Sequence, residues 1–227
     1  MFTGLVETTG ILRRRTSGTV ARAFIECSLA PLSLGESIAV NGVCLTVDHI
    51  LPKGFEADMS PETLEKTTLG QLALGALVHL ERATPLGGRM GGHVVLGHVD
   101  GIGQVHSKNP QGEALRLSLS APKSLARFVA PKGSIALDGL SLTVNTVGES
   151  SGDAFYFDVM LVPHTLQKTL LHNYTTKSLI NIEVDVLARY VARQLEFSPG
   201  APAPAKEQSH ASSDDRLLKK LQTNGYL

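Results

Sequence analysis

The residues best suited to chemistry lie in a seven-residue stretch that the chain carries twice. The first copy spans residues 41–47 and reads Asn-Gly-Val-Cys-Leu-Thr-Val. The second spans residues 138–144, 97 positions later, and reads Asp-Gly-Leu-Ser-Leu-Thr-Val. Cys44 therefore corresponds to Ser141, so the copies differ at a position where chemistry depends on residue type. Ser141 and Thr143 alternate on one strand face, which lets both reach one ligand.

Cys44 has two interpretations. A lone cysteine in an apolar strand is usually a small core residue. The functional interpretation is nucleophilic addition or a polar contact that positions water, and we favour the contact. Ordinary β-propensity is a fair alternative explanation for Thr143 and a weaker one for Ser141.

The elements that must position these residues begin with the stretch itself. Each copy follows a short apolar run, residues 37–40 or 134–137. An Asx-Gly dipeptide between apolar runs is typical of a β-hairpin. The residue after each glycine is apolar and the run continues, so a bulge or kinked strand is equally consistent.

Three further blocks repeat in the same order, with spacings that grow from 93 to 102 residues. They pair residues 2–7 with 95–100, residues 61–67 with 163–169, and residues 77–81 with 179–183. Chance similarity does not keep four blocks in order. The chain is therefore expected to contain two homologous domains, residues 1–88 and 89–186, joined at the glycine-rich residues 87–92.

Within each half, short β-branched runs alternate with turn residues, which indicates a small antiparallel barrel or sandwich. In the first half the expected strands are Arg22–Cys27, Ser37–Val40, Leu45–Ile50, Gly54–Met59 and Leu77–Arg82. The blocks that begin at Pro61 and Pro163 predict short helices with proline in the first turn.

After Asp185 the pattern becomes helical. Leu187, Val191 and Leu195 recur every four residues and share one helix face. This predicted helix, residues 187–197, lies outside both repeats and needs a partner for its apolar face. The partner is either the chain's own barrels or another subunit, and we favour the subunit. Residues 198–227 read as a linker-like tail.

Composition excludes several classes of function. The chain has 227 residues, of which 42% are hydrophobic, so it can form a substantial core. Its 21 basic side chains balance 21 acidic ones, which predicts no nucleic acid partner and no anionic membrane partner. No apolar run is long enough to span a bilayer, and no secretory signal is expected.

Cys27 and Cys44 are too few for a disulfide scaffold, so both are expected to be reduced thiols in a cytoplasmic protein. No metal site is predicted. His93 and His98 are five residues apart, which places them on opposite faces of a strand. We expect His93 to be structural.

Taken together, residues 1–7, 41–47, 91–100 and 138–144 resemble riboflavin synthase. The resemblance covers residues 1 to about 193 and rests on motifs in family order. It implies an all-β fold of two homologous six-stranded antiparallel Greek-key barrels with short helices, plus a C-terminal helix. It also implies a homotrimer formed through that helix.

The reaction that the resemblance implies is the dismutation of two molecules of 6,7-dimethyl-8-ribityllumazine. One molecule gives a four-carbon unit to the other, and the products are riboflavin and 5-amino-6-(D-ribitylamino)uracil. The site is expected between the first barrel of one subunit and the second barrel of its neighbour. The resemblance implies no metal and no cofactor. Two identical substrates in different roles require two related but unequal pockets, and a duplicated domain supplies them.

Carrying the family's positions over residue by residue gives two sets. The first-barrel set is Gly4, Leu5, Val6, Cys44, Leu45, Thr46, Asp58, Met59, Ser60, Pro61, Glu62 and Thr63. The second-barrel set is Gly97, His98, Val99, Lys132, Ser141, Leu142, Thr143, Leu161, Val162, Pro163, His164, Thr165 and Leu166. The residues expected to be catalytic are Cys44, His98, Ser141, Asp185 and Phe2.

Several of these residues have plain alternatives. His98 is either a surface residue or a group that transfers protons or stabilises an oxyanion. Lys132 is either a solvated loop residue or a contact for the anionic substrate edge. Asp185 caps the following helix, takes part in catalysis, or does both. Phe2 is expected over the site. His164 replaces the acidic residue that Glu62 provides in the first repeat.

Two other functions compete with the enzyme. Non-catalytic antenna relatives in luminous bacteria bind lumazine or flavin in one barrel and lose polar site residues in one half. Polar candidates are present in both halves here, which favours the enzyme. A flavin-binding reductase domain would require a following nucleotide-binding α/β domain, and the sequence has none.

Overall fold

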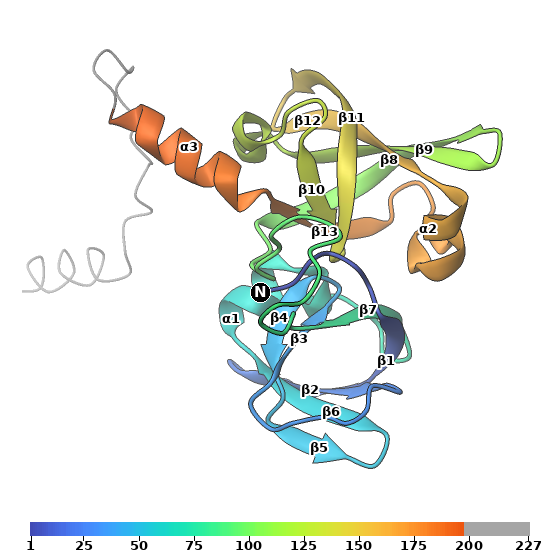
Figure 1. The fold of residues 1–227 in the computed structure, drawn as a ribbon, viewed down its shortest axis with the longest axis vertical. Helices are drawn as coiled ribbons and strands as arrows, with labels where there is room; N and C mark the ends of the chain where they lie inside the picture. The colour runs from blue at the N-terminus through green and yellow to red at the C-terminus, as the bar shows by residue number, and fades with distance from the viewer. Residues whose placement is uncertain (198–227) are drawn as a thin grey trace, which may run out of the picture. The chain divides into compact units, whose positions relative to one another are not determined.

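A computed structural model describes residues 1–197, and the predicted tail, residues 198–227, lies outside the described residues. The first repeat forms a seven-stranded antiparallel sheet with the strand order β4-β3-β7-β1-β2-β6-β5 (Figure 1). Its strands are β1 (Thr8–Arg15), β2 (Ala21–Glu26), β3 (Ser37–Val40), β4 (Val43–Thr46), β5 (His49–Leu51), β6 (Gly54–Met59) and β7 (Leu77–Arg82). Helix α1 (Pro61–Lys66) and the 3-10 turn η1 (Thr68–Gly70) lie between β6 and β7.

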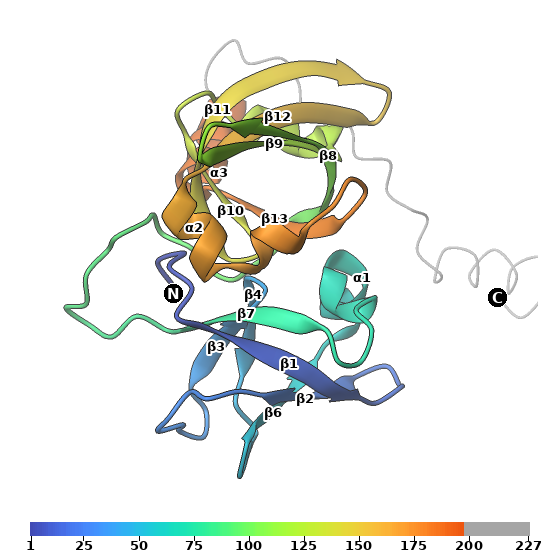
Figure 2. The ribbon, with the colours of Figure 1, turned by 90° about the vertical axis from the view of Figure 1, so that its right-hand side faces the viewer.

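The second repeat forms a closed barrel with the order β10-β11-β12-β9-β8-β13, which Figure 2 shows as a ring of strands. Its strands are β8 (Gly101–Gln111), β9 (Ala114–Pro122), β10 (Ser134–Leu137), β11 (Leu140–Ser151), β12 (Ala154–Leu161) and β13 (Leu179–Val184). The helical elements are η2 (Lys123–Phe128), α2 (Pro163–Lys168), η3 (Leu170–Asn173) and α3 (Val186–Glu196).

The two repeats differ where the first would close its ring. In the second repeat, β11 pairs with both β10 and β12 and bends at a register shift between Val144 and Thr146. In the first repeat, the segment equivalent to β11 is split into two strands, because β4 ends at Thr46 and β5 begins at His49. The single strand predicted at Leu45–Ile50 is therefore wrong. The expectation of two barrel-like antiparallel units is confirmed.

Other sequence predictions can be compared directly. Ser37–Val40, Gly54–Met59 and Leu77–Arg82 are strands with the predicted bounds, and Arg22–Cys27 is shifted by one residue. The strand β1 was not predicted. The proline-led helices form as predicted, and Ser60 caps α1 by accepting a hydrogen bond from the Thr63 amide at 3.1 Å.

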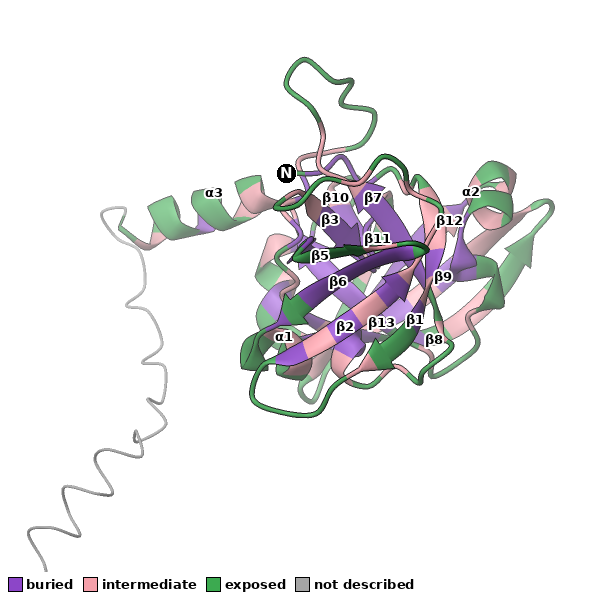
Figure 3. Cartoon of the chain, turned by 90° about the horizontal axis from the view of Figure 1, so that it is seen from below, coloured by how far each residue is buried: buried purple, intermediate pink, exposed green. Residues whose placement is uncertain are grey.

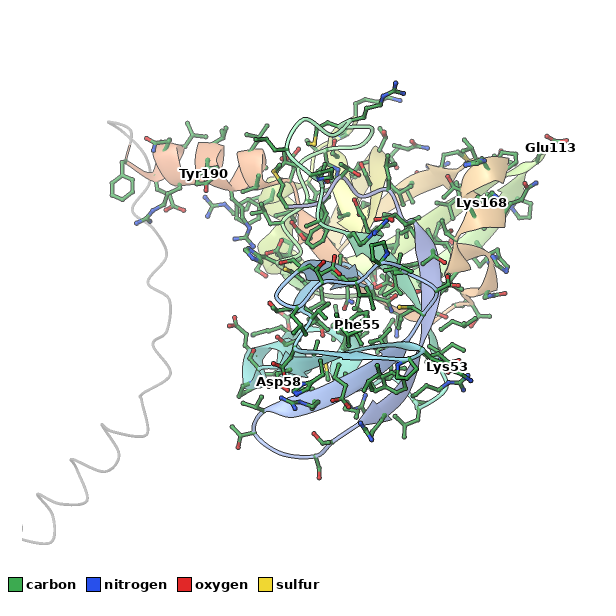
Figure 4. All side chains as sticks on the ribbon, turned by 60° about the horizontal axis from the view of Figure 1, so that its bottom comes forward. Lys53, Phe55, Asp58, Glu113, Lys168 and Tyr190 are labelled. Carbon is green, nitrogen blue, oxygen red and sulfur yellow. The ribbon has the colours of Figure 1, made fainter. Side chains whose placement is uncertain are left out.

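Each repeat has its own apolar core, drawn in purple in Figure 3. The first core includes Ile38, Phe55 and Leu80, and the second includes Leu117, Phe157 and Ile182. On β6, Phe55 is buried in the first core and Asp58 is exposed, and both are labelled in Figure 4. These cores hold the hairpins that carry Cys44 and Ser141.

Two short segments cross from one repeat to the other. We call residues 2–6 the first crossing segment and residues 95–99 the second crossing segment. They pair with one another through an antiparallel bridge between Phe2 and Val95. These two side chains form a small buried cluster with Ala39 of β3 and Ala136 of β10. Val6 then packs against the second core, whereas Val99 packs against the first.

Helix α3 follows β13 directly. The Asp185 carboxylate accepts a hydrogen bond from the Leu187 amide at 2.9 Å, which caps the helix as the sequence allowed. In the first turns, Arg189 forms an ion pair with Asp100 and stacks over the Phe128 ring. The chain divides into two units after Tyr190, and residues 191–196 are the described helical part of the second unit.

Candidate functional site

The site is built on two tight hairpin turns. Asn41-Gly42 and Asp138-Gly139 all have positive φ, from 45° to 83°, and each pair joins strands in register as a two-residue turn. That is the geometry of a type I′ hairpin, so at both Asx-Gly pairs the hairpin alternative is correct. A Cβ atom on Gly42 would lie 2.6 Å from the Gly139 nitrogen, so the two turns pack closely against each other.

The crossing segments bring site residues together in a different grouping from the one predicted. The Cys44 amide donates to the Gly97 carbonyl at 2.9 Å, and the Ser141 amide donates to the Gly4 carbonyl at 2.8 Å. Cys44 therefore belongs with residues 97–99, and Ser141 with residues 4–6. The assignment of Gly4, Leu5 and Val6 to the first barrel, and of Gly97, His98 and Val99 to the second, is wrong. Each segment serves the opposite barrel.

Glycine is required where the segments cross. Gly4 and Gly97 have φ near +77° and +78°, and a Cβ on either would lie 2.6 Å from the Cβ of its partner, Ser141 or Cys44. Positive φ is unfavourable for residues with a Cβ, and these contacts leave no room for one. The crossing segments can therefore lie this close to Ser141 and Cys44 only because Gly4 and Gly97 have no side chain.

The first pocket is a cavity of about 280 Å³ at Cys44. It lies between β4, helix α1 and the second crossing segment, and its lining residues are Val43, Cys44, Glu62, Thr63, Lys66, Thr67, Gly97, His98 and Val99. Cys44 is partly buried and His98 is exposed. A thiol, an imidazole, a carboxylate and hydroxyl groups thus surround one space. Such a set can hold a polar heterocycle and exchange protons with it.

We use the name second pocket for the equivalent place in the second repeat, where Ser141 contacts the first crossing segment. The Ser141 Oγ lies 2.7 Å from Nδ1 of His93, within hydrogen-bonding distance. Burial lowers the pKa of His93, and the negative charge of Asp185 partly opposes this effect. A neutral imidazole bonded to a hydroxyl can accept its proton. His93 was expected to be only structural, and the structure places it beside Ser141.

The two pockets are therefore alike in scaffold and unlike in chemistry. The first combines Cys44 with His98. The second has Ser141 with His93, and the position equivalent to His98 is Leu5. The duplicated motif of glycines and polar residues pointed to both pockets, but repeat alignment alone did not pair His93 with Ser141.

Other predicted residues fall into three groups. Leu45, Met59 and Leu161 have side chains inside the cores, so only their backbones can reach a ligand. Val162, His164, Thr46 and Thr143 are exposed, and Pro61, Pro163, Thr165, Leu142 and Leu166 lie on α1, α2 or β11 with exposed or partly buried side chains. Asp58 is exposed and bonds Arg22 at 2.8 Å, an interaction that lowers the carboxyl pKa.

Two predicted residues have local structural roles. Lys132 occupies a turn with φ of 68°, and its amide donates to the Val144 carbonyl at 2.7 Å. Phe2 is fully buried between the repeats, with 0% exposure, instead of lying open over a pocket. In this chain the Phe2 ring therefore fixes the crossing segments against each other.

A larger hollow of about 600 Å³ lies beside the first crossing segment. Thr3, Leu5, Glu7 and Arg89 are among its lining residues, but neither Cys44 nor Ser141 is. Its Glu7 and Arg82 side chains form an ion pair at 3.2 Å. We therefore assign the chemistry to the smaller cavity and its counterpart.

Within residues 1–197, no group of three or more histidine, cysteine, aspartate or glutamate side chains could hold a metal ion. Both cysteines are free thiols. In the same part of the chain no helix is long and apolar enough to cross a membrane.

The comparison with protein families agrees with the geometry. A family described as the lumazine binding domain matches the chain twice, over residues 3–83 and 96–185. The fold and the paired pockets therefore define a protein with two lumazine-binding domains. The match covers each barrel together with the crossing segment that precedes it.

Curated relatives give the family. Riboflavin synthase of Mycobacterium tuberculosis (strain H37Rv) is 45% identical over 197 residues, which cover 85% of this chain and 97% of that protein. Riboflavin synthase of Photobacterium phosphoreum is 37% identical over the full length of both proteins. The chain belongs to the riboflavin synthase family and is an enzyme of the transferase class.

Solved structures share the fold. LumP in complex with riboflavin has a TM-score of 0.69 and 25% identity, and covers 81% of this chain and 99% of its own. LumP in complex with 6,7-dimethyl-8-(1'-D-ribityl) lumazine has the same TM-score at 23% identity.

Proposed function

We propose that this chain catalyses the dismutation of two molecules of 6,7-dimethyl-8-ribityllumazine. A four-carbon unit passes from one molecule to the other, and the products are riboflavin and 5-amino-6-(D-ribitylamino)uracil. What one substrate loses the other gains, so the reaction balances without an oxidant or a reductant. The observation that carries the proposal is the exchange of crossing segments, which places Cys44 and Ser141 in equivalent positions with unequal side chains around them.

The residues divide between two roles. In the first pocket, Cys44 and His98 contact one heterocycle, and Thr63 offers a hydroxyl for its ring or ribityl chain. In the second pocket, Ser141 contacts the other heterocycle while His93 accepts or returns its proton. The ring-conjugated methyl group of the substrate is acidic, so the protein has to orient two rings and move protons. Holding both reactants in position can contribute about 7–11 kcal/mol.

The assembly that we propose is a homotrimer, with each active site between the first barrel of one subunit and the second barrel of its neighbour. Large apolar side chains of α3 support it, because Leu187, Tyr190, Val191 and Leu195 are each at least 59% exposed in the single chain. Exposed apolar stripes of this kind are typical of association surfaces. The proposal keeps the predicted division into domains 1–88 and 89–186, helix 187–197 and tail 198–227, and a cytoplasmic location.

Turnover of the purified full-length chain tests the function. With 6,7-dimethyl-8-ribityllumazine alone and no added cofactor, we expect fluorescent riboflavin to appear while two substrate molecules disappear for each product formed. Tight stoichiometric binding without turnover would refute the enzymatic proposal and support an antenna-type binding protein.

A further inference from the structure

Two buried carboxylates hold the crossing segments. Glu81 on β7 and Glu183 on β13 occupy equivalent positions in the repeats and are only 4% and 5% exposed. Each lies in a strand whose neighbouring residues are largely buried and apolar. Burying a carboxylate is costly unless hydrogen bonds compensate. Their partners therefore indicate what these two residues do.

The partners of Glu183 are successive amides of the second crossing segment. The Leu96 amide donates to Oε1 at 2.6 Å and the Gly97 amide donates to Oε2 at 2.9 Å. The Gly97 carbonyl in turn accepts from the Cys44 amide at 2.9 Å. Glu183 thus holds the Gly97 amide while the Cys44 amide holds the Gly97 carbonyl, immediately before His98 and beside the first pocket.

Glu81 makes the equivalent contacts with the first crossing segment. Its Oε1 accepts from the Thr3 amide at 2.7 Å and from the Thr3 hydroxyl at 2.8 Å, and its Oε2 accepts from the Gly4 amide at 3.1 Å. The Gly4 carbonyl accepts from the Ser141 amide at 2.8 Å. Glu81 therefore fixes the segment that completes the second pocket.

We propose that each carboxylate is the positioning residue for the pocket of the opposite repeat. Glu183, in the second repeat, holds Gly97 and His98 against Cys44 in the first pocket. Glu81, in the first repeat, holds Gly4 and Leu5 against Ser141 in the second pocket. The ligand part of this inference rests on the proposed function, and the positional part does not.

Glutamine is the sharpest replacement because it keeps the size of the side chain. The two carboxylate oxygens of Glu183 accept from the Leu96 amide and from the Gly97 amide, respectively. Glutamine offers one carbonyl oxygen, and its NH2 group would face the second amide donor to donor. An unsatisfied buried donor of this kind corresponds to roughly a fivefold to hundredfold easier local opening.

A thiol reporter tests the positional part without any ligand. In a Cys27→Ala background, Cys44 is the only thiol, and its labelling rate reports the first pocket. We expect Glu183→Gln to raise this rate about tenfold and Glu81→Gln to change it less than about twofold. With the reporter moved by Cys44→Ser and Ser141→Cys, the order should reverse. Equal effects of both glutamines on both reporters would overturn the proposal.

Riboflavin protection tests the ligand part. Bound riboflavin should slow Cys44 labelling in the Cys27→Ala chain and in its Glu81→Gln variant, and should lose this effect in Glu183→Gln. Circular dichroism checks that each variant folds. If Glu183→Gln does not fold, Glu183→Asp replaces it, because the shorter carboxylate cannot reach both amides, and unchanged labelling there would refute the proposal. One outcome separates the two proposals. If the effects of the two glutamine variants reverse between the Cys44 and Ser141→Cys reporters, but no chain, including the parent, forms riboflavin, the proposed function is refuted and the positioning role stays supported.

Discussion

Replacing Gly97 by alanine should weaken both the fold and the first pocket. Gly97 has φ of +78°, and an added Cβ would lie 2.6 Å from the Cys44 Cβ and 2.8 Å from its nitrogen. The left-handed backbone costs alanine about 1–2 kcal/mol. Relieving the overlap costs about 1–3 kcal/mol more, and losing the Cys44 amide hydrogen bond costs about 1 kcal/mol. We therefore expect Gly97→Ala to lower the free energy of unfolding by roughly 3–6 kcal/mol.

Gly112 provides the matched control. It has φ of +63°, but nothing lies within 4 Å of the position that an added Cβ would take, so Gly112→Ala carries only the backbone cost. The chain has no tryptophan, so urea unfolding is best followed by circular dichroism. Gly97→Ala should lose at least about 2 kcal/mol more than Gly112→Ala and bind riboflavin at least about tenfold more weakly. Equal losses in the two variants would refute the close crossing of the segments at Cys44.

Three further predictions concern groups around the pockets. Burial raises the pKa of Asp138 to about 7, so the native state holds its proton more tightly than the unfolded chain does. The difference in free energy of unfolding between the parent chain and Asp138→Asn should therefore fall as pH rises from about 4 to 7 and then level off. Urea titrations that give the same difference at every pH would contradict this prediction. Asp185→Ala should lose about 0.5–2 kcal/mol of stability because the helix cap is lost. Asp185→Asn keeps the cap, so if its turnover falls while its stability is unchanged, the charge of Asp185 is catalytic. A chain truncated before Val186 should sediment as a monomer, and an intact trimer would refute the role of α3.

Much of the local structure could be predicted from the sequence. The Asn41-Gly42 and Asp138-Gly139 pairs indicated hairpin turns, because few other residues tolerate two successive positive φ values, although the sequence left a bulge equally consistent. Strand β1 was missed because its end, Arg13–Arg15, resembles a solvated charged segment. In the structure Arg15 donates to the carbonyls of Leu69 and Leu72, at 2.7 and 2.8 Å, so the guanidinium group ties the end of β1 to the segment around η1.

The grouping of site residues could not be predicted in the same way. An internal repeat shows which segments are equivalent, but it does not show which copy each segment contacts. Gly4 and Gly97 therefore looked like parts of their own barrels, although each contacts the other one. The signal for Glu81 and Glu183 was present, since both occupy the same position in the repeated blocks 77–81 and 179–183. Only the positions of the crossing segments show what these carboxylates bind.

Hybrid rings provide the most direct test of the central claim, that unlike pockets from two subunits form one active site. His98→Ala disables the first pocket and Ser141→Ala the second, so each variant alone should turn over slowly. When the two variants are unfolded, mixed and refolded together, each mixed ring contains one interface with both pockets intact. We expect riboflavin formation in the mixture to exceed clearly the sum of the rates of the separate variants. Activity equal to that sum would contradict it.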